Sequence, residues 1–149
     1  MSVFNHVVKA SSLEVAELCK LHENTFRAVN ISYANQMRDY SAHLEINFDE
    51  VVSLAKSKPF GFMPFNSGIG VGGHCIPVDP YFLLSKADKS GVKMSIVEKA
   101  MIEIQNEPKK TFDWLVEKKI LGKDVLLTGI AYKDGVSDIR CSPAIELFN

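Results

Sequence analysis

The segment at residues 57–78 restricts the fold of this chain more than any other. It contains three prolines and five glycines, and four of the glycines lie in the run G-I-G-V-G-G at residues 68–73. Proline fixes φ and lacks a backbone donor, while glycine adopts positive φ values that other residues avoid. Because no regular helix or strand tolerates this mixture, we expect a long loop here.

Residues 10–44 precede the loop and have the pattern of one long helix. Ser11 and Glu14 have the spacing of a capping box at its start. Mostly apolar side chains then recur at intervals of three or four, at Val15, Leu18, His22, Phe26, Val29, Tyr33, Met37, Tyr40 and Leu44. A helix of roughly 33 residues is about 50 Å long, more than the core of a small monomer can cover. We therefore expect this helix to pack against a partner subunit.

Two shorter helices are predicted on either side of the loop. One covers residues 49–56, where Asn47 is placed to cap the first turn. The other covers residues 80–91, where Gly91 is placed to end the helix. The loop therefore has helices at both of its ends.

The rest of the chain combines one more helix with an α/β pattern. Residues 94–119 have helical periodicity, but Pro108 lies inside them and should kink or split the helix. Residues 124–132 form a continuous apolar run typical of a buried parallel strand. Pro143 then begins a helix that Ser142 caps. We expect a mainly α fold followed by the start of an α/β domain, so the chain has the pattern of a fragment.

Composition excludes several classes of function. The net charge is −1, which provides no field to attract nucleic acid or an anionic membrane. No apolar run approaches the ~20 residues that span a bilayer, and the first residues lack the features of a secretory signal. The three cysteines, at positions 19, 75 and 141, are odd in number and far apart. This usage indicates a reduced, cytoplasmic protein rather than a disulfide scaffold.

The glycine run formally satisfies G-x-G-x-x-G through Gly68, Gly70 and Gly73. A dinucleotide-binding fingerprint also needs a strand before the run and a helix opening at its third glycine. No strand pattern precedes this run, and Pro77 follows too soon for a regular helix. We therefore expect the glycines to let backbone approach another group closely and to present N–H groups beside Cys75.

Cys75 is the candidate nucleophile of this segment. Cysteine attacks as its thiolate, which nearby positive charge or a helix N-terminus favours, and Pro77 and Asp79 indicate that a helix begins just after it. Asp79 is also close enough to position a water or a proton. One alternative is that Cys75 is a small buried apolar residue. Metal binding by His74 and Cys75 is a weaker alternative, because adjacent side chains rarely share an ion and no further cluster supports it.

The long helix carries candidate donors. Lys20 and Asn24 are four residues apart and share one face, which Ile31 and Asn35 extend. A lysine and an amide together could donate to an oxyanion. The alternative is an ordinary solvated face of a helix. From the residues alone, the chain offers a nucleophile and donors but no substrate.

Three segments, in this order, resemble motifs of the nucleotide-sugar 6-dehydrogenases, the UDP-glucose/GDP-mannose dehydrogenase family. The long helix contains KLHENTFRAVNISYANQ, which is similar to the family's K-x-x-x-N-[TA] segment. The loop contains GVGGHCIPVDPYFL, which is similar to its G-G-x-C-x-x-x-D cysteine motif. The last segment, GIAYKDGVSDIRCSPAIEL, is similar to the motif that opens its C-terminal domain.

The resemblance implies a domain organisation. Residues 1–118 would form the central helical domain, which resembles the C-terminal domain of 6-phosphogluconate dehydrogenase and contains the catalytic-cysteine loop. Its long helix would form the core of a homodimer. Residues 119–149 would be the truncated start of an α/β UDP-binding domain, consisting of its first strand and helix. The family's N-terminal NAD-binding domain would be absent, so this chain alone is not expected to turn over substrate.

The resemblance also implies an activity. Such enzymes oxidise the C6 alcohol of a UDP-sugar twice with two NAD⁺, through a cysteine thiohemiacetal and a thioester, and release a uronate. His74, Val78 and the preceding KPFGFMPF are more similar to enzymes acting on UDP-N-acetylhexosamines, such as UDP-N-acetyl-D-mannosamine or UDP-N-acetylglucosamine, than to those acting on UDP-glucose. UDP-glucose remains the alternative substrate, and a non-catalytic helical dimerisation module with an inert cysteine remains the alternative function.

Roles carry over to the positions that match. Cys75 would be the nucleophile, Lys20 and Asn24 would stabilise the oxyanion and position water, and Asp79 would assist proton transfer and hydrolysis. Arg140 would reach the NAD cofactor, and no metal is implied. The implied UDP-sugar site consists of Ile31, Phe65, Gly72, Gly73, Tyr132 and Lys133. Two positions depart from the family pattern: Ser67 stands where proline is common, and Gln36 stands where glutamate is usual.

Overall fold

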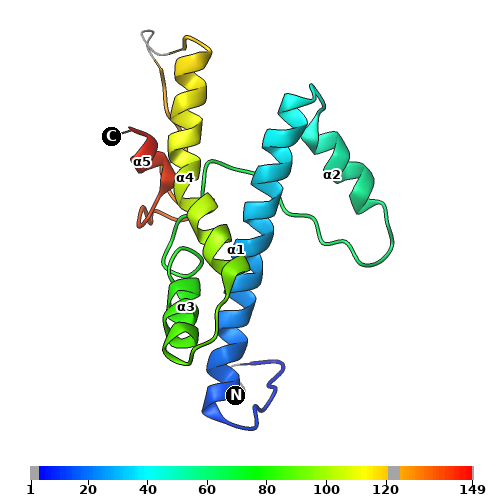
Figure 1. Cartoon of the computed structure of the whole chain (residues 1–149), viewed down its shortest axis with the longest axis vertical. Helices are drawn as coiled ribbons and strands as arrows, with labels where there is room; N and C mark the ends of the chain where they lie inside the picture. Colours follow the sequence, from blue (N-terminus) through cyan, green and yellow to red (C-terminus); the bar gives the residue numbers. More distant parts are fainter. Residues whose placement is uncertain (1–3, 121–124, 149) are drawn as a thin grey trace.

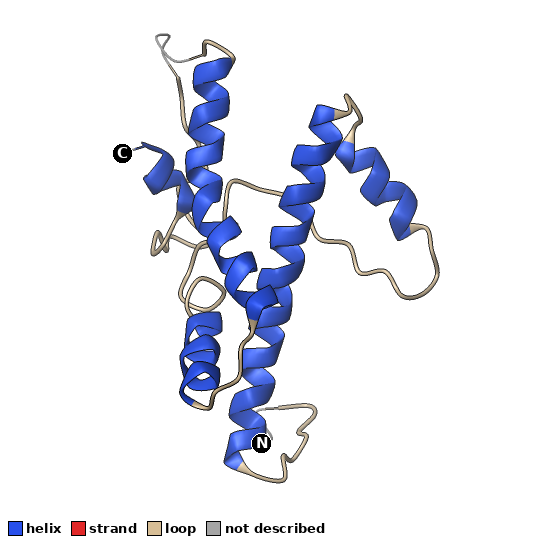
Figure 2. Cartoon of the chain, in the orientation of Figure 1, coloured by secondary structure: helices blue, strands red, loops and turns tan. Residues whose placement is uncertain are grey.

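The computed structural model describes residues 4–120 and 125–148, and within these ranges the chain is helical, without a strand (Figure 2). The helices are α1 (Leu13–His43), α2 (Phe48–Lys56), α3 (Asp79–Lys89), α4 (Ser95–Glu117) and α5 (Pro143–Phe148). Figure 1 shows α1 as the long axis of the molecule, with α3, α4 and α5 on one side of it and α2 on the other. The mainly α fold predicted from the sequence is confirmed.

Side-chain caps explain where the first helices begin. The side chain of Ser12 accepts a hydrogen bond from the backbone N–H of Val15 at 3.3 Å, so Ser12 rather than the predicted Ser11 caps α1. The prediction was wrong by one residue because two adjacent serines precede the helix, and the spacing alone does not say which has the extended backbone of a cap. Asn47 caps α2 as predicted, since its side-chain oxygen accepts from the N–H of Asp49 at 2.9 Å.

The ends of α3 and the middle of α4 also follow from local chemistry. Gly91 lies just beyond α3, where it was predicted to end the helix, and its φ of 74° is the left-handed conformation in which glycine commonly follows a helix. Helix α4 continues through Pro108, so the proline does not split it. Figure 1 shows α4 changing direction along its length. This is the bend expected where a proline removes one backbone donor from a helix.

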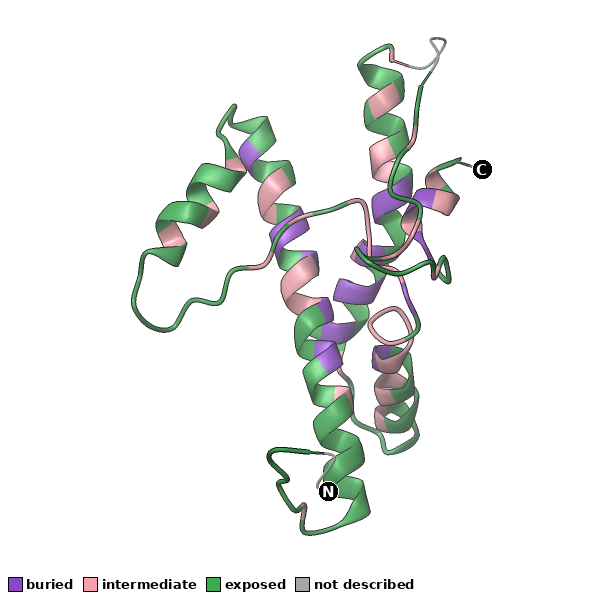
Figure 3. Ribbon diagram, turned by 180° about the vertical axis from the view of Figure 1, so that it is seen from behind, coloured by how far each residue is buried: buried purple, intermediate pink, exposed green. Residues whose placement is uncertain are grey.

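The apolar core is small and lies where α1 crosses α4 (Figure 3). Ala28 of α1 packs there against residues of α4, and residues of the loop and of α3 close the cluster. The buried members are Ala28, Val97, Met101 and Ile104, and the partly buried ones are Val29, Val71, Ile76, Leu84 and Met94. The core thus fixes the loop that carries Cys75 against two helices.

The predicted apolar stripe of α1 is largely exposed. The side chains of Tyr33 and Tyr40 are 59% and 57% exposed, and Val15 and Leu18 also face solvent. The side of α1 that this chain buries is instead polar or small, at Asn24, Thr25, Ala28, Ser32 and Asn35. The chain's own residues therefore do not cover the apolar face of its longest helix.

The predicted strand at residues 124–132 is not found among the residues that the structure describes there, 125–132, and position 124 lies outside the description. A strand forms only by pairing, and the described part of the chain provides no second strand. The segment is held instead by side-chain and loop contacts: Ser142 Oγ donates to the carbonyl of Ile130 at 2.6 Å. Helix α5 begins at Pro143, as predicted. None of the helices described is both long and apolar enough to cross a membrane.

Candidate active site

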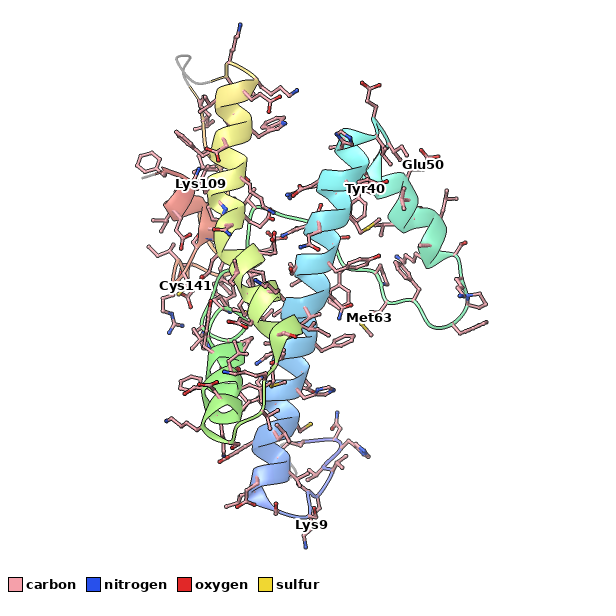
Figure 4. The ribbon with its side chains drawn as sticks, in the orientation of Figure 1. Lys9, Tyr40, Glu50, Met63, Lys109 and Cys141 are labelled. Carbon is pink, nitrogen blue, oxygen red and sulfur yellow. The ribbon has the colours of Figure 1, made fainter. Side chains whose placement is uncertain are left out.

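A cavity of about 1020 Å³ opens between α1, the loop after α2 and residues 132–133. Met63, labelled in Figure 4, is one of the loop residues that line it. The cavity brings together most of the residues predicted to form the site, from three separate segments: Lys20, Asn24, Ile31, Phe65, Gly72, Gly73, Cys75, Tyr132 and Lys133. Asp79 and Arg140 do not line it.

Helix α1 forms one wall of the cavity because its lining residues share one face. Lys20, Asn24 and Ile31 recur at spacings that return to the same side of a helix, as predicted. Asn24 is 3% exposed, whereas Lys20 reaches solvent. Arg27 and Glu23 also line the cavity, and the sequence reasoning missed them although Arg27 follows the same spacing.

Cys75 lies in a tight turn directly before α3. Its carbonyl accepts hydrogen bonds from the N–H groups of Val78 at 3.0 Å and Asp79 at 2.7 Å, and Asp79 is the first residue of α3. The predicted position of the cysteine just before a helix N-terminus is therefore confirmed. Cys75 is partly buried, and its thiol is free.

Asp79 joins the site through Asn24. The side-chain amide of Asn24 donates a hydrogen bond to the Asp79 carboxylate. A residue on the cavity wall therefore holds the carboxylate that was predicted to belong to the site. Helix α3 has no side-chain cap of its own. This contact therefore also ties the first turn of α3 to α1.

The glycine run packs against the C-terminal segment. A Cβ atom on Gly72 would lie 2.6 Å from Cβ of Tyr132, and one on Gly70 would lie 2.9 Å from Cβ of Pro143. The N–H of Gly73 donates to the carbonyl of Arg140 at 2.8 Å. The close approach predicted for these glycines is confirmed, but the group that they approach is the protein itself.

This packing bears on where NAD can bind. No helix opens at Gly73, and the side chains of Tyr132 and Pro143 occupy the space beside the run that a dinucleotide-binding loop would leave to a pyrophosphate. The described residues therefore do not form a dinucleotide cradle at this run. Among them, no group of three or more His, Cys, Asp or Glu side chains is placed to hold a metal ion.

Aromatic side chains line the cavity on two sides. Phe65 packs edge-on against Phe26, with ring centroids 5.8 Å apart. The Lys133 ammonium lies 5.5 Å from the centroid of the Tyr132 ring, a distance at which a cation and an aromatic ring attract each other. The cavity thus combines aromatic walls with cations.

Arg140 is directed to another partner. Its Nε and Nη2 atoms lie 3.0 Å and 2.5 Å from the Asp138 carboxylate oxygens, and its backbone N–H donates to the same carboxylate at 3.0 Å. Hydrogen bonds from the Arg140 side chain, and then from its backbone, lower the pKa of Asp138 to about 2. The cofactor role of Arg140 stays a prediction.

The sequence reasoning also missed two residues of α1 that hold the loop. Asn35 and Arg38 both form hydrogen bonds to the backbone of Gly68. The sequence pattern places Asn35 on the face of Lys20 but gives it no role, and no motif marks Arg38. These contacts join residues at least 30 positions apart, which helical spacing cannot reveal.

Comparison with known proteins gives a consistent picture. The profile of the UDP-glucose/GDP-mannose dehydrogenase family, central domain, matches residues 14–106. The UDP-N-acetyl-D-mannosamine dehydrogenase of Campylobacter jejuni is 34% identical over 139 residues, which are 92% of this chain and 33% of that protein.

Solved structures agree. The UDP-D-ManNAc dehydrogenase of Pyrococcus horikoshii is 34% identical with a TM-score of 0.76, over 91% of this chain and 33% of that one. The UDP-glucose dehydrogenase of Pyrobaculum islandicum is 28% identical with a TM-score of 0.81, over 89% of this chain and 31% of that one. This chain spans about a third of the length of each of these proteins.

Proposed function

The chain belongs to the UDP-glucose/GDP-mannose dehydrogenase family, and from this we propose that it supplies the catalytic cysteine and the dimer core of an NAD-dependent UDP-sugar 6-dehydrogenase. Residues 1–118 would be the central domain, and residues 119–149 would begin the UDP-binding domain. The observation that carries the proposal is that Lys20, Asn24 and Cys75 line one cavity. Two distant segments thus contribute a cation, an amide and a thiol to the same space.

The proposed chemistry of these residues begins at the aldehyde stage of the reaction. The Cys75 thiolate adds to the aldehyde carbon of the sugar, a carbon–sulfur bond forms, and the electron pair of the carbonyl moves to its oxygen. Lys20 and Asn24 would donate to this oxygen, because they line the same cavity as the thiol. NAD⁺, which we expect to be bound mainly by residues outside this chain, would supply the two-electron oxidation that converts this thiohemiacetal into a thioester.

Hydrolysis of the resulting thioester needs a base for the attacking water. Asp79 would accept a proton from the water as its oxygen bonds to the thioester carbon, and the carbon–sulfur bond would then break to release a carboxylate and the Cys75 sulfur as its thiolate. The hydrogen bond from Asn24 supports this role, since it holds the Asp79 carboxylate beside the cavity wall. Asn24, which lines the cavity and contacts this carboxylate, would position the attacking water.

The cavity supports a nucleotide-sugar substrate. Its volume of about 1020 Å³ suits a ligand of that size. Its aromatic walls and its cations, including Lys133, suit a sugar ring and a diphosphate. We assign the UDP-sugar to Ile31, Phe65, Gly72, Gly73, Tyr132 and Lys133, and the cofactor contact to Arg140. The acetamido sugars named for the relatives at 34% identity favour a UDP-N-acetylhexosamine over UDP-glucose.

The exposed face of α1 supports a homodimer. Tyr33 and Tyr40 lie two helical turns apart and both face solvent, as do Val15 and Leu18 further towards the N-terminus. A second copy of this chain packed along α1 would cover these side chains. The long first helix would then form the centre of the dimer.

The reactivity of Cys75 tests the proposal. Cys19 and Cys141 are exposed free thiols in the same chain and serve as internal references. We expect iodoacetamide to alkylate Cys75 faster than either reference at pH 7, with peptide mass spectrometry as the readout. Lys20→Met should slow Cys75 selectively, whereas the control Lys9→Met should leave it unchanged. Equal rates at all three thiols would favour an inert helical module instead.

A further inference from the structure

We infer that Asn35 and Arg38 are positioning residues that fix the cysteine loop by holding both backbone groups of Gly68. The N–H of Gly68 donates to Oδ1 of Asn35 at 2.9 Å, and its carbonyl accepts from Nη1 of Arg38 at 2.9 Å. Asn35 and Arg38 are three residues apart on α1, so both reach the same side of the helix. The inference rests on the proposed function only in assigning Cys75 a reaction.

The backbone of Gly68, rather than its lack of a side chain, is what α1 recognises. A Cβ atom on Gly68 would meet only the carbonyl of Gly70, at an ordinary 3.9 Å. Gly70 and Gly72, by contrast, have no room for a Cβ atom. Gly68 therefore anchors the glycine run to α1 through its backbone. Gly70 and Gly72 instead allow the run to pack closely against the C-terminal segment.

Arg38 is itself fixed from the far side by α4. Its Nη2 atom lies 2.7 Å from Oε2 of Glu107, whose side chain is 0% exposed, and 2.7 Å from Oδ1 of Asp39. Lys110 also contacts Glu107, at 3.1 Å. Burial opposes the charge of Arg38, but the hydrogen bonds to Glu107 and Asp39 outweigh it and raise the pKa of the guanidinium. The forked guanidinium of Arg38 thus links the buried Glu107 carboxylate to the loop.

An unsatisfied hydrogen-bond donor on Asn35 also indicates that this residue is there to bind Gly68. The residue is 0% exposed, and its Nδ2 atom has no hydrogen-bond partner among the described residues. An unpaired buried amide group is unfavourable, and an apolar side chain would avoid it. The acceptor that Asn35 offers to Gly68 is therefore what accounts for an asparagine at this buried position.

These contacts matter because the loop has few others. Between residues 59 and 72 of the described chain, the two bonds to Gly68 are the hydrogen bonds that tie the loop to the rest of the protein. The next ones are at Gly73, which donates to Arg140, and at the carbonyl of Cys75. The segment between Gly68 and Cys75 is thus held at both ends, and the α1 anchor is one of the two.

Amide hydrogen exchange of the whole chain tests this anchor directly. In Asn35→Leu and in Arg38→Met, we expect exchange at residues 68–75 to rise by about tenfold or more, and in Asn35→Leu the amides of α4 should stay unchanged. Gln36→Met, on the exposed side of α1, is the matched control and should leave the loop unchanged. Unaltered exchange at residues 68–75 in both variants would overturn the inference.

Two further measurements separate positioning from general stability. Arg38→Lys keeps a positive charge but cannot bond Glu107 and Gly68 with one fork, so its loop exchange should fall between those of the wild type and Arg38→Met. If loop exchange in Arg38→Lys equals that of the wild type, the simultaneous binding of Glu107 and Gly68 by the Arg38 guanidinium is not what holds the loop. Should Arg38→Met fail to fold because Glu107 loses a partner, Asn35→Leu decides the question, since it removes no charge.

The rate of Cys75 alkylation relative to Cys19 provides the functional readout. We expect this ratio to change at least severalfold in Asn35→Leu while the thermal midpoint of α-helix loss stays close to that of Gln36→Met. An unchanged ratio, when Cys75 of the wild type is the fast thiol, would overturn the positioning role. Slow wild-type Cys75 together with raised loop exchange in the variants would support the anchor and count against the proposed function.

Discussion

The side-chain amide of Asn24 donates a hydrogen bond to the carboxylate of Asp79, 55 positions further along the chain. This bond joins the middle of α1 to the first residue of α3. Because the N–H of Asp79 also donates to the carbonyl of Cys75, the position of α1 is coupled to the turn that carries the thiol. Two groups proposed to act on one substrate are therefore held by each other.

Removing this bond should cost stability. Asn24→Ala leaves the partly buried Asp79 carboxylate without its amide donor, and we expect a loss of about 1.5–3 kcal/mol, the range for hydrogen bonds to charged groups. Urea denaturation followed by circular dichroism measures it. Gln36→Ala on the exposed side of α1 should stay within about 0.5 kcal/mol. Equal losses in the two variants would contradict the importance of the contact.

Gly72 should not accept a side chain. Gly72→Ala places a Cβ atom 2.6 Å from Cβ of Tyr132 and 3.0 Å from the carbonyl of Cys141, so we expect about 1–3 kcal/mol of destabilisation from overpacking. Gly68→Ala is the matched control, since its Cβ atom has room. Urea denaturation of both variants compares them.

A double mutant identifies the cause. In a Tyr132→Gly background, Gly72→Ala should cost less than in the wild type, because Tyr132→Gly removes the Cβ atom that the new side chain would strike. The difference between the two backgrounds is the coupling energy of the pair. Additive effects would show that the strain arises elsewhere.

The Asp138 carboxyl group should have an abnormally low pKa. The Arg140 side chain holds its pKa at about 2, against an ordinary value of 3.8. A lowered folded-state pKa means that the pair stabilises the fold above about pH 4, and that this contribution is lost as the pH falls towards 2. Carboxyl ¹³C NMR gives the midpoint directly. In Arg140→Ala the pKa should return towards the ordinary value, and an unchanged midpoint would exclude Arg140 as the cause.

The exposed face of α1 should govern self-association. We expect the chain to form dimers in sedimentation velocity experiments, and Tyr33→Asp/Tyr40→Asp to weaken them at least tenfold, which is about 1.4 kcal/mol. Charges placed on a buried apolar contact would lose hydration without gaining a partner. Asn106→Asp, at an exposed position of α4 rather than on this face of α1, tests whether any new surface charge has this effect. A wild-type chain that stays monomeric at all concentrations would refute the dimer.

Much of the fold could be predicted because its signals are local. The periodicity of α1, the cap at Asn47 and the break at Gly91 depend on neighbours within one or two turns. The strand expected at residues 124–132 failed for the opposite reason, because a strand depends on another strand that its own residues do not reveal. The face of α1 that would be buried was likewise unpredictable from apolar spacing, since this chain covers Asn24 and Asn35 and leaves Tyr33 exposed.

The candidate site divides in the same way. Cys75 and Asp79 were identifiable because the turn and the helix start that place them lie within five residues. Lys20 and Asn24 could be placed on one face of α1 from their spacing. Only the resemblance to a known family predicted that they share a site with Cys75. The anchor at Gly68 could not be predicted, because helical spacing does not connect Asn35 and Arg38 to a loop residue at least 30 positions away, or Arg38 to the buried carboxylate of Glu107.

The fit of Gly70 and Gly72 against Pro143 and Tyr132 has a consequence for inheritance and for engineering. A bulkier residue on either side of this contact requires a smaller one opposite. Substitutions in the glycine run and in residues 130–143 must therefore compensate each other. Grafting the helical portion onto a foreign scaffold without residues 130–143 would leave an empty trough beside the thiol. Recombination between relatives should therefore succeed only when its crossover points keep both stretches from the same parent.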